Sequence, residues 1–333
     1  MSLRLAPAAL ARLGADPPPA PRLVCLGLTA LDLVWSVQSL PCGSGKLRAR
    51  SFAEGGGGMA ANAAVAAARL GADVHFWGRA GNDRAGVAMR DALAAEGVDV
   101  TALRCFDGAV SSVSGIVVDA SGERSIVNFR GEGLPAAPDW LPLHEVARAS
   151  AVLADPRWPE GAIALFDAAR RASVPTVLDG DVADAEVFDS LLGRVDYAIF
   201  SQPGLAAYAG GGPGVDADAG AGLARQLDHA LARGCRLAAV TLGERGVVWD
   251  DGQGLRRLDA PRVDVVDTTG AGDVFHGAFC FAIGAGLGVG DAFVLASAVA
   301  AIKCTRPGGR AGAPDLAATL EHLQTCQPIE DTR

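Results

Sequence analysis

Short apolar runs alternate with amphipathic stretches along most of this chain. Uniformly apolar runs of this length, bounded by turn residues, predict buried strands. They are RLVCLGL (22–28), DVHFWG (73–78), SAVLAD (150–155), PTVLDG (175–180), DYAIF (196–200) and RLAAVTLG (236–243).

Helical periodicity fills much of the sequence between these runs. The predicted helices cover residues 60–70, 83–96, 160–172, 219–234, 271–286, 290–304 and 314–325. Strands that are apolar throughout and separated by helices indicate a mainly parallel sheet covered on both faces. The predicted fold class is therefore α/β.

Two segments break this rhythm. Residues 33–54 lack helical periodicity, and residues 111–130 alternate around DASG like an antiparallel hairpin. We expect them to form a small β-sheet lid, which would exclude water from reactive phosphates. The predicted organisation is a flexible or loosely docked leader (1–20), an α/β core (21–32, 55–107 and 132–326), the lid (33–54 and 108–131) and a tail (327–333).

Composition narrows the class of protein. The net charge of -9 argues against a surface built for nucleic acid, which needs clustered Lys and Arg. No apolar run is long enough to predict a membrane span. The 7 cysteines lack the paired short spacing of zinc or redox sites. Reduced thiols and a cytoplasmic location are expected.

The segment VDTTGAGDVFHGAF (266–279) places Asp273 directly behind Gly270, Ala271 and Gly272, where a helix is predicted to begin. The first N–H groups of a helix lack intrahelical partners and favour an anion such as a transferring phosphoryl group. Asp273 could then accept the proton of an attacking hydroxyl. The simpler alternative is that Asp273 only caps the helix.

The full pattern D-T-x-G-A-G-D, followed by an aromatic residue and glycine, resembles the C-terminal signature of the ribokinase/PfkB family of carbohydrate kinases. The resemblance implies a ribokinase-like core with a β-sheet lid and ATP-dependent phosphorylation of a sugar hydroxyl. Asp273 would be the base, and residues 270–272 would form the anion hole. It also implies a homodimer that pairs through the lid.

EGGGGMAANAAVAAARLGADVHFWGRAGNDRAG (54–86) is similar to the first signature of that family. The resemblance assigns sugar contacts to Gly57, Gly58 and Asn62, and to Asp32 after the first strand. VTLGERGVVW (240–249) resembles the nucleotide-binding turn. The residues implied for nucleotide binding are Thr241, Gly243, Gly246, Lys303 and Gly308.

The implied metal sites depart in part from the family pattern. The usual N-x-x-E element near the metal and phosphates is replaced by SQPG (201–204). Asp179 and Asp181 of LDGD could hold hydrated Mg²⁺ instead, or could simply cap a strand end. The resemblance also implies that Asp267 and Thr269 help to hold a monovalent cation such as K⁺.

The segments LPCGSGKLRAR, VLADPRWPEGA and AIKCTRPGGRAGAPD resemble the 6-deoxy-6-sulfofructose kinase subgroup. This implies that Lys46, Asn128 and Arg157 bind the sulfonate, which suits a lysine charge, an amide and a guanidinium fork. Lys46 could instead be a solvated lid residue, and Arg157 could pair with Asp155 or Glu160.

The predicted reaction is therefore phosphorylation of the 1-hydroxyl of 6-deoxy-6-sulfofructose. Fructose 6-phosphate, ribose or a nucleoside are alternative substrates, and a non-catalytic sugar-sensing regulator is an alternative of another class.

Two further segments only partly match known nucleotide-binding motifs. GSGK (43–46) lacks the first glycine and the final Ser or Thr of a phosphate loop. GGGMAA (56–61) approximates a dinucleotide-binding motif but does not follow a buried strand.

Overall fold

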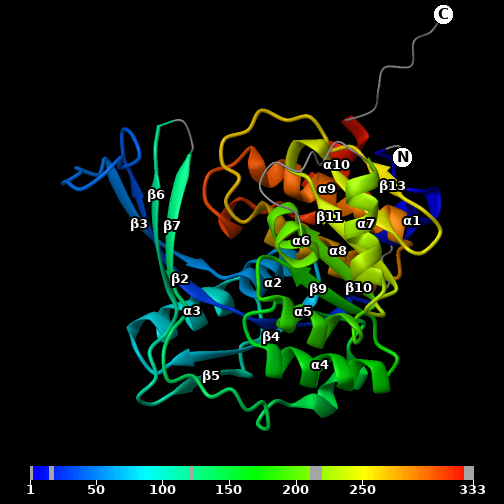
Figure 1. Ribbon diagram of the computed structural model, residues 1–333, viewed down its shortest axis with the longest axis horizontal. Helices are drawn as coiled ribbons and strands as arrows, with labels where there is room; N and C mark the ends of the chain where they lie inside the picture. Colours follow the sequence, from blue (N-terminus) through cyan, green and yellow to red (C-terminus); the bar gives the residue numbers. More distant parts are fainter. Residues whose placement is uncertain (1–2, 15–18, 121–122, 211–219, 326–333) are drawn as a thin grey trace, which may run out of the picture.

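The computed structural model describes residues 3–14, 19–120, 123–210 and 220–325, so the predicted tail lies outside the described residues. Two sheets form its framework (Figure 1). The larger sheet has the order β13 (Arg256–Leu258), β12 (Val247–Asp250), β11 (Leu237–Thr241), β10 (Tyr197–Ser201), β9 (Thr176–Gly180), β8 (Ala151–Ala154), β1 (Arg22–Gly27), β4 (Asp73–Gly81) and β5 (Leu103–Phe106).

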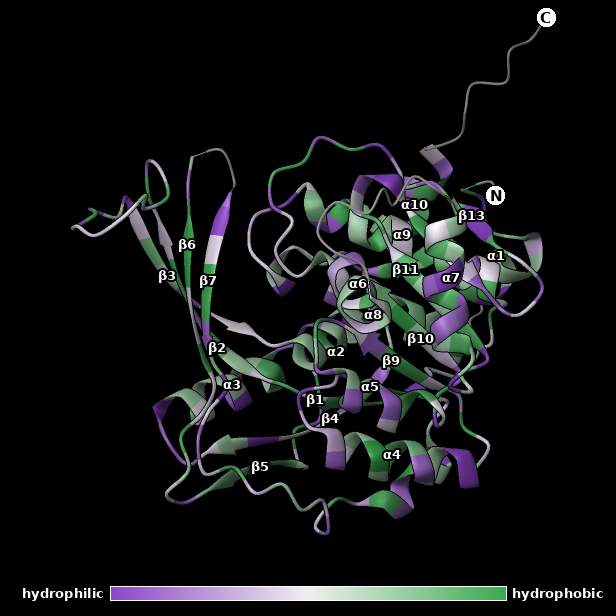
Figure 2. Ribbon diagram, in the orientation of Figure 1, coloured by the Kyte–Doolittle hydropathy of each residue, from purple (hydrophilic) through white to green (hydrophobic). Residues whose placement is uncertain are grey.

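Seven neighbouring strands of this sheet run parallel, namely β11, β10, β9, β8, β1, β4 and β5. At one edge, β12 pairs antiparallel with β11 and β13 pairs antiparallel with β12. Successive residues of β1 face opposite cores, because Leu23 and Cys25 pack in one apolar cluster and Val24 and Leu26 in the other. Figure 2 shows hydrophobic residues along β9, β10 and β11. The predicted sheet, buried on both faces, is confirmed.

Helices cover both faces of this sheet. One face carries α2 (Met59–Arg69), α8 (Ala271–Gly284) and α9 (Val289–Cys304), and the other carries α4 (Pro159–Arg171), α5 (Ala185–Leu192), α6 (Gln202–Ala209) and α7 (Gly220–Leu231). The remaining helices are α1 (Pro7–Leu13), α3 (Arg84–Ala95) and α10 (Leu316–Thr325). The short helices α1, α5 and α6 were not predicted.

The alanine-rich sequence of α2 has a packing reason. Residues 59–67 of α2 are all buried, and small side chains let α2 and α8 approach closely. A Cβ on Gly277 of α8 would lie only 2.1 Å from the carbonyl oxygen of Ala63. Close contact between α2 and α8 brings the two glycine-rich motifs together.

The smaller sheet has the order β3 (Ser51–Gly57), β2 (Ala30–Ser36), β6 (Val113–Val118) and β7 (Arg124–Phe129). It projects beside the core (Figure 1), and β6 and β7 form the expected antiparallel hairpin. Its bounds differ from those predicted for the lid. Strand β2 begins inside the segment assigned to the core, and β3 extends through residue 57.

Where the structure describes the leader, it is docked on the core and not flexible. Residues 7–13 form α1, and Leu5, Ala9 and Leu13 are buried in the core cluster beside α9. The amide of Ala6 donates to the carboxylate of Asp291 at 2.8 Å. Apolar spacing too short to be recognised as a helix in the sequence is thus stabilised by tertiary packing.

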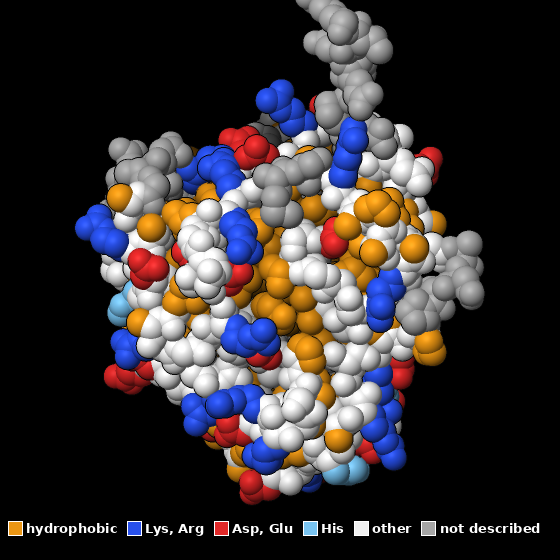
Figure 3. Space-filling model, turned by 90° about the vertical axis from the view of Figure 1, so that its right-hand side faces the viewer, with side chains coloured by type: hydrophobic (Ala, Val, Ile, Leu, Met, Phe, Trp, Pro, Cys, Tyr) orange, Lys and Arg blue, Asp and Glu red, His pale blue; other side chains and the backbone are white. Residues whose placement is uncertain are grey.

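The outer surface is mixed in charge. On the face turned away from the small sheet, Lys and Arg side chains are interspersed with Asp and Glu (Figure 3). Among the described residues, no helix combines the length and hydropathy needed to cross a membrane.

Candidate active site

Helix α8 begins where the sequence predicted. Its N-cap, Gly270, has φ 70°, a left-handed conformation that glycine adopts without strain. The amide of Ala271 donates to the carbonyl of Thr268 at 3.2 Å, so Ala271 shapes the turn rather than offering its N–H to an anion. A Cβ on Gly272 would meet nothing within 4 Å, so the helix start is open there.

Asp273 in the first turn of α8 is joined to α2. Its Oδ2 accepts a hydrogen bond of 2.7 Å from Nδ2 of Asn62, which is 6% exposed. Two residues 211 positions apart in the chain thus meet at the predicted base. The side chain of Asp273 supplies no helix cap, since the N-cap is Gly270 and has no side-chain cap bond.

The surroundings of Asp273 raise its pKa to about 7. Burial is the largest cause, and the negative charge of Asp179 adds to it. The hydrogen bond from Asn62 and the charge of His276 oppose the rise. A carboxylate with this pKa is a better proton acceptor near neutral pH than an ordinary aspartate.

We therefore expect kcat/KM to rise with pH and to level off above about 7. Only the deprotonated carboxylate accepts the hydroxyl proton, so activity should fall about tenfold per pH unit well below that value. Initial rates between pH 5 and 9 at constant ionic strength measure the profile. A flat profile across that range would contradict the assignment of Asp273 as the base.

Polar side chains form one row across the small sheet. Asp32 on β2 pairs with Ser114 on β6, which pairs with Asn128 on β7. Asn128 Nδ2 donates to Ser114 Oγ at 3.1 Å, and Ser114 hydrogen-bonds the Asp32 carboxylate. Burial raises the pKa of Asp32, and Ser114 opposes the rise. Ser114 could not be predicted from the local sequence, because its role depends on the pairing of β6 with β2 and β7.

Gly57 and Gly58 stand beside this row for steric reasons. A Cβ on Gly57 would lie 2.1 Å from an oxygen of Asp32. Gly58 has φ +95°, and a Cβ there would lie 2.4 Å from the carbonyl oxygen of Leu28. Glycine lets β3 end against Asp32 and lets α2 begin at once.

A buried carboxylate that sequence reasoning missed holds the region together. Asp155 at the end of β8 is 0% exposed. Its Oδ2 accepts from the amides of Leu28 (2.7 Å) and Ala60 (3.1 Å), and its Oδ1 accepts from the amide of Arg157 (2.9 Å). Asp155 therefore joins the chain just before Asp32 to the chain just before Asn62.

The three residues predicted to bind the sulfonate make separate contacts in the structure. Arg157 donates to Asp181 Oδ2 at 2.9 Å and to the carbonyl of Val182 at 2.6 Å. Its salt bridge is thus with Asp181, not with Asp155 or Glu160 as considered from the sequence. Lys46 is exposed in the connection between β2 and β3. In the described part of the chain, no hydrogen bond or ion pair joins Lys46, Asn128 and Arg157.

The two aspartates predicted to bind Mg²⁺ differ in exposure. The side chain of Asp179 is 2% exposed, its Oδ2 lies 3.3 Å from Nδ1 of His276, and burial raises its pKa well above the ordinary value. Asp179 therefore does not fit a hydrated Mg²⁺, and we correct that prediction. Asp181 is 40% exposed and does fit, since Mg²⁺ commonly uses one protein carboxylate with water and phosphates.

The SQPG segment has a structural role. Ser201 is the N-cap of α6, with its Oγ accepting from the amide of Gly204, and it also donates to Asp181 Oδ1 at 3.1 Å. No cluster of three or more metal-binding side chains occurs in the residues described. Asp181, held by Ser201 and Arg157, stays a predicted ligand of Mg²⁺.

The predicted nucleotide residues fall in two places. Thr241 ends β11, and Gly243 and Gly246 form the turn to β12, with φ +59° and +84°. Strand register places Thr241 beside Ser201 at the carboxyl edge of the sheet. Gly308 instead lies against Asp267, to which its amide donates at 2.8 Å.

Lys303 does not fit its predicted role. Its side chain is 0% exposed, and its Nζ donates to the carbonyl oxygen of Asp267 at 2.6 Å. A fully buried ammonium cannot contact a nucleotide in the open site. The assignment of Lys303 to nucleotide binding is therefore corrected.

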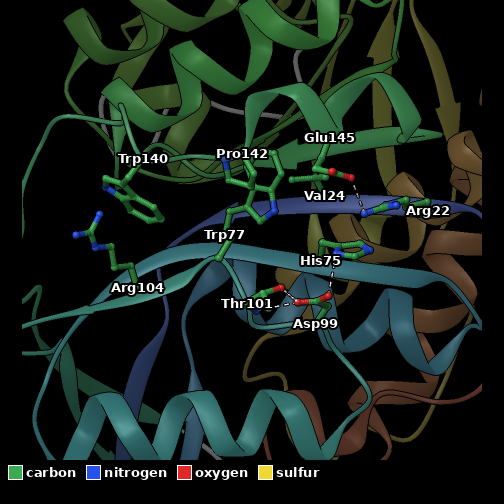
Figure 4. Close-up of a pocket in the computed structure, with 11 residues that line it drawn as sticks. Arg22, Val24, His75, Trp77, Asp99, Thr101, Arg104, Trp140, Pro142 and Glu145 are labelled. Carbon is green, nitrogen blue, oxygen red and sulfur yellow. Dashed lines mark hydrogen bonds and ion pairs between the residues drawn. The ribbon is translucent and has the colours of Figure 1, made fainter.

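A separate cavity of about 570 Å³ lies on the opposite side of β1 and β4 from α2 (Figure 4). None of the residues predicted for sugar, nucleotide or metal lines it. Arg22 lies 3.3 Å from Glu145 and His75 lies 3.3 Å from Asp99, while the guanidinium of Arg104 lies over the rings of Phe106 and Trp140.

The chain is similar in sequence to known proteins. Residues 20–316 match the sequence model of the pfkB family carbohydrate kinases. A ribokinase of Haemophilus influenzae is 30% identical over 306 residues, which are 91% of this chain and 98% of the relative. An aminoimidazole riboside kinase of Salmonella typhimurium is 29% identical over 274 residues, 77% of this chain and 82% of the relative.

Solved structures are similar to this chain in fold. A crystal structure from Agrobacterium tumefaciens has a TM-score of 0.85 and 33% identity, over 92% of this chain and 98% of that chain. Arabidopsis thaliana ribokinase complexed with ribose and ATP has a TM-score of 0.80 and 25% identity, over 92% and 99%.

Proposed function

Because the chain belongs to the pfkB family of carbohydrate kinases, we propose that it transfers the γ-phosphoryl group of ATP to the 1-hydroxyl of 6-deoxy-6-sulfofructose. The products would be ADP and the sugar 1-phosphate. The observation that carries a phosphotransfer role is the Asn62–Asp273 hydrogen bond, which joins α2 to a partly buried carboxylate of raised pKa in the first turn of α8.

Each part of the site has a role in this reaction. Asp32, supported by Ser114 and Asn128, would accept hydrogen bonds from sugar hydroxyls. Asp273 would take the proton of the attacking hydroxyl, and the first-turn amides of α8 would stabilise charge on the phosphoryl oxygens. Asp181 would hold Mg²⁺, which when bound neutralises phosphate charge.

Asn128 and Arg157 would bind the sulfonate end of the sugar. A guanidinium carries five N–H donors, so Arg157 can hold Asp181 and Val182 and still present donors to an anion. Lys46 would join them if the connection between β2 and β3 moved over the bound sugar. Lid closure of this kind is common where water must be excluded.

A sugar panel tests the substrate. Purified enzyme with ATP and Mg²⁺ is assayed with 6-deoxy-6-sulfofructose, fructose 6-phosphate, ribose and adenosine, and kcat/KM is compared. The highest value for the sulfonate supports the proposal. Ribose is the second candidate, because the named relatives include ribokinases. The highest value for ribose or adenosine would overturn sulfonate specificity.

We expect Arg157→Ala to raise KM for the anionic sugar by at least about tenfold, the typical value of a charge-assisted hydrogen bond. KM for ATP should change much less. The matched control is Arg171→Ala, which removes an exposed arginine from the other end of α4. Steady-state kinetics in both substrates gives the comparison. An equal rise in both KM values would contradict sulfonate recognition by Arg157.

A homodimer through the small sheet stays a proposal, and the composition of that sheet supports it. Phe52, Val127 and Phe129 are 52%, 75% and 47% exposed, and the rings of Trp35 and Phe52 are in contact. Large exposed apolar side chains gathered on one sheet mark an interaction surface. Sedimentation of the purified chain measures the assembly.

A further inference from the structure

Lys303 in the last turn of α9 is a buried cation with a defined partner. Its side chain is 0% exposed, and its Nζ lies 2.6 Å from the main-chain oxygen of Asp267 and 3.7 Å from Oδ1 of the same residue. A buried ammonium is unfavourable unless it is paired and hydrogen-bonded. Burial lowers the pKa of Lys303, and Asp267 opposes this.

The partner segment leads straight to the catalytic turn. The amides of Val266 and Asp267 donate to the carbonyl of Cys304 at 2.8 and 3.0 Å. The Asp267 carboxylate accepts from the amides of Thr269 and Gly308, both at 2.8 Å. Residues 266–269 are therefore bound to the end of α9, and Gly270 and α8 follow directly.

The oxygens that face Lys303 are ligands suited to a cation. A main-chain carbonyl and a carboxylate of Asp267 converge on the ammonium, beside the last turn of α9, where the helix dipole favours positive charge. Asp267 and Thr269 are the residues for which the family resemblance implies a monovalent cation. K⁺ does not fit between Asp267 and Lys303, because the ammonium already lies at hydrogen-bond distance from the Asp267 oxygen.

We propose that the Lys303 ammonium is a built-in monovalent cation that holds residues 266–270 in the active conformation, so that the kinase works without K⁺. Lys303 is a positioning residue, since it reaches the phosphoryl group only through Asp267 and the turn. The proposal rests on the kinase activity of the chain and not on which sugar it phosphorylates.

Two substitutions separate the charge of Lys303 from the space it fills. Lys303→Ala removes the charge and leaves room for a small cation, whereas Lys303→Met removes the charge and keeps a long apolar side chain. Wild type and both variants are compared in KCl, NH₄Cl and choline chloride at equal ionic strength. Two quantities are measured. The first is kcat, with the sugar that the panel described under the proposed function shows to be phosphorylated, and the second is Tm in the absence of sugar.

We expect wild-type kcat and Tm to be the same in all three salts. Lys303→Ala should lose at least about tenfold in kcat in choline chloride, because a small misplacement of the catalytic turn is costly. Potassium and ammonium should restore much of that kcat and raise the Tm of Lys303→Ala. Lys303→Met should lose kcat to a similar extent and respond to neither cation.

Three results would overturn the proposal: activation or stabilisation of the wild type by K⁺ relative to choline, full activity of Lys303→Ala in choline, or rescue of Lys303→Met. If Lys303→Ala does not fold, the wild type and Lys303→Met still test the proposal, because full activity of Lys303→Met in choline chloride would also overturn the proposal. A wild type inactive on 6-deoxy-6-sulfofructose but active on ribose overturns only the substrate proposal, and the Tm comparison needs no sugar.

Discussion

Asp273→Asn is expected to lower turnover by at least about a hundredfold, the usual size of a general-base contribution. The substitution is nearly isosteric, and the amide oxygen can still accept the hydrogen bond from Asn62. What it removes is the ability to take a proton from the sugar hydroxyl. Nucleotide binding and Tm should therefore remain close to wild type, as calorimetric titration with ADP and thermal unfolding would measure.

The matched control is Asp291→Asn, which makes the same change in the first turn of the neighbouring helix α9. Its carboxylate accepts from the amide of Ala6 and contacts none of the predicted site residues. Turnover of Asp291→Asn should equal that of the wild type. Wild-type turnover in Asp273→Asn would remove this residue from the mechanism, and with it the proposed role for the raised pKa.

Asp155→Ala is expected to lower the free energy of unfolding by about 3 kcal/mol or more, because three buried or partly buried main-chain amides lose their acceptor. Burial raises the pKa of Asp155, and the hydrogen bonds from the amides of Leu28, Arg157 and Ala60 oppose part of this rise. Urea denaturation of wild type and variant measures the difference.

Asp155→Asn should give an intermediate loss. Its amide oxygen can serve Leu28 and Ala60, while its NH₂ group faces the amide of Arg157, another donor. The graded order, wild type above Asn above Ala, follows from the number of amides left without an acceptor. Equal stability of the wild type and Asp155→Ala would contradict the role of Asp155 as the brace of this region.

The local pattern of the sequence determined much of the fold. Apolar runs predicted the central parallel strands, and helical periodicity placed α2, α3, α4 and α7 through α10 close to their observed bounds. Alternation around residues 119–122 predicted the β6–β7 hairpin. The short helices α1, α5 and α6 could not be predicted, because each contains too few residues for its hydrophobic periodicity to be distinguished from that of a loop.

The sequence also located Asp273 at the start of a helix, since glycines before a polar residue and an apolar stretch are a local signal. Only the tertiary structure decided which side chains meet there. Asn62 reaches Asp273 because α2 packs on α8, Ser114 reaches Asp32 because β6 pairs with β2, and Asp179 and Lys303 are buried by their neighbours. Burial and partners depend on contacts between distant segments, which a local pattern of residues does not contain.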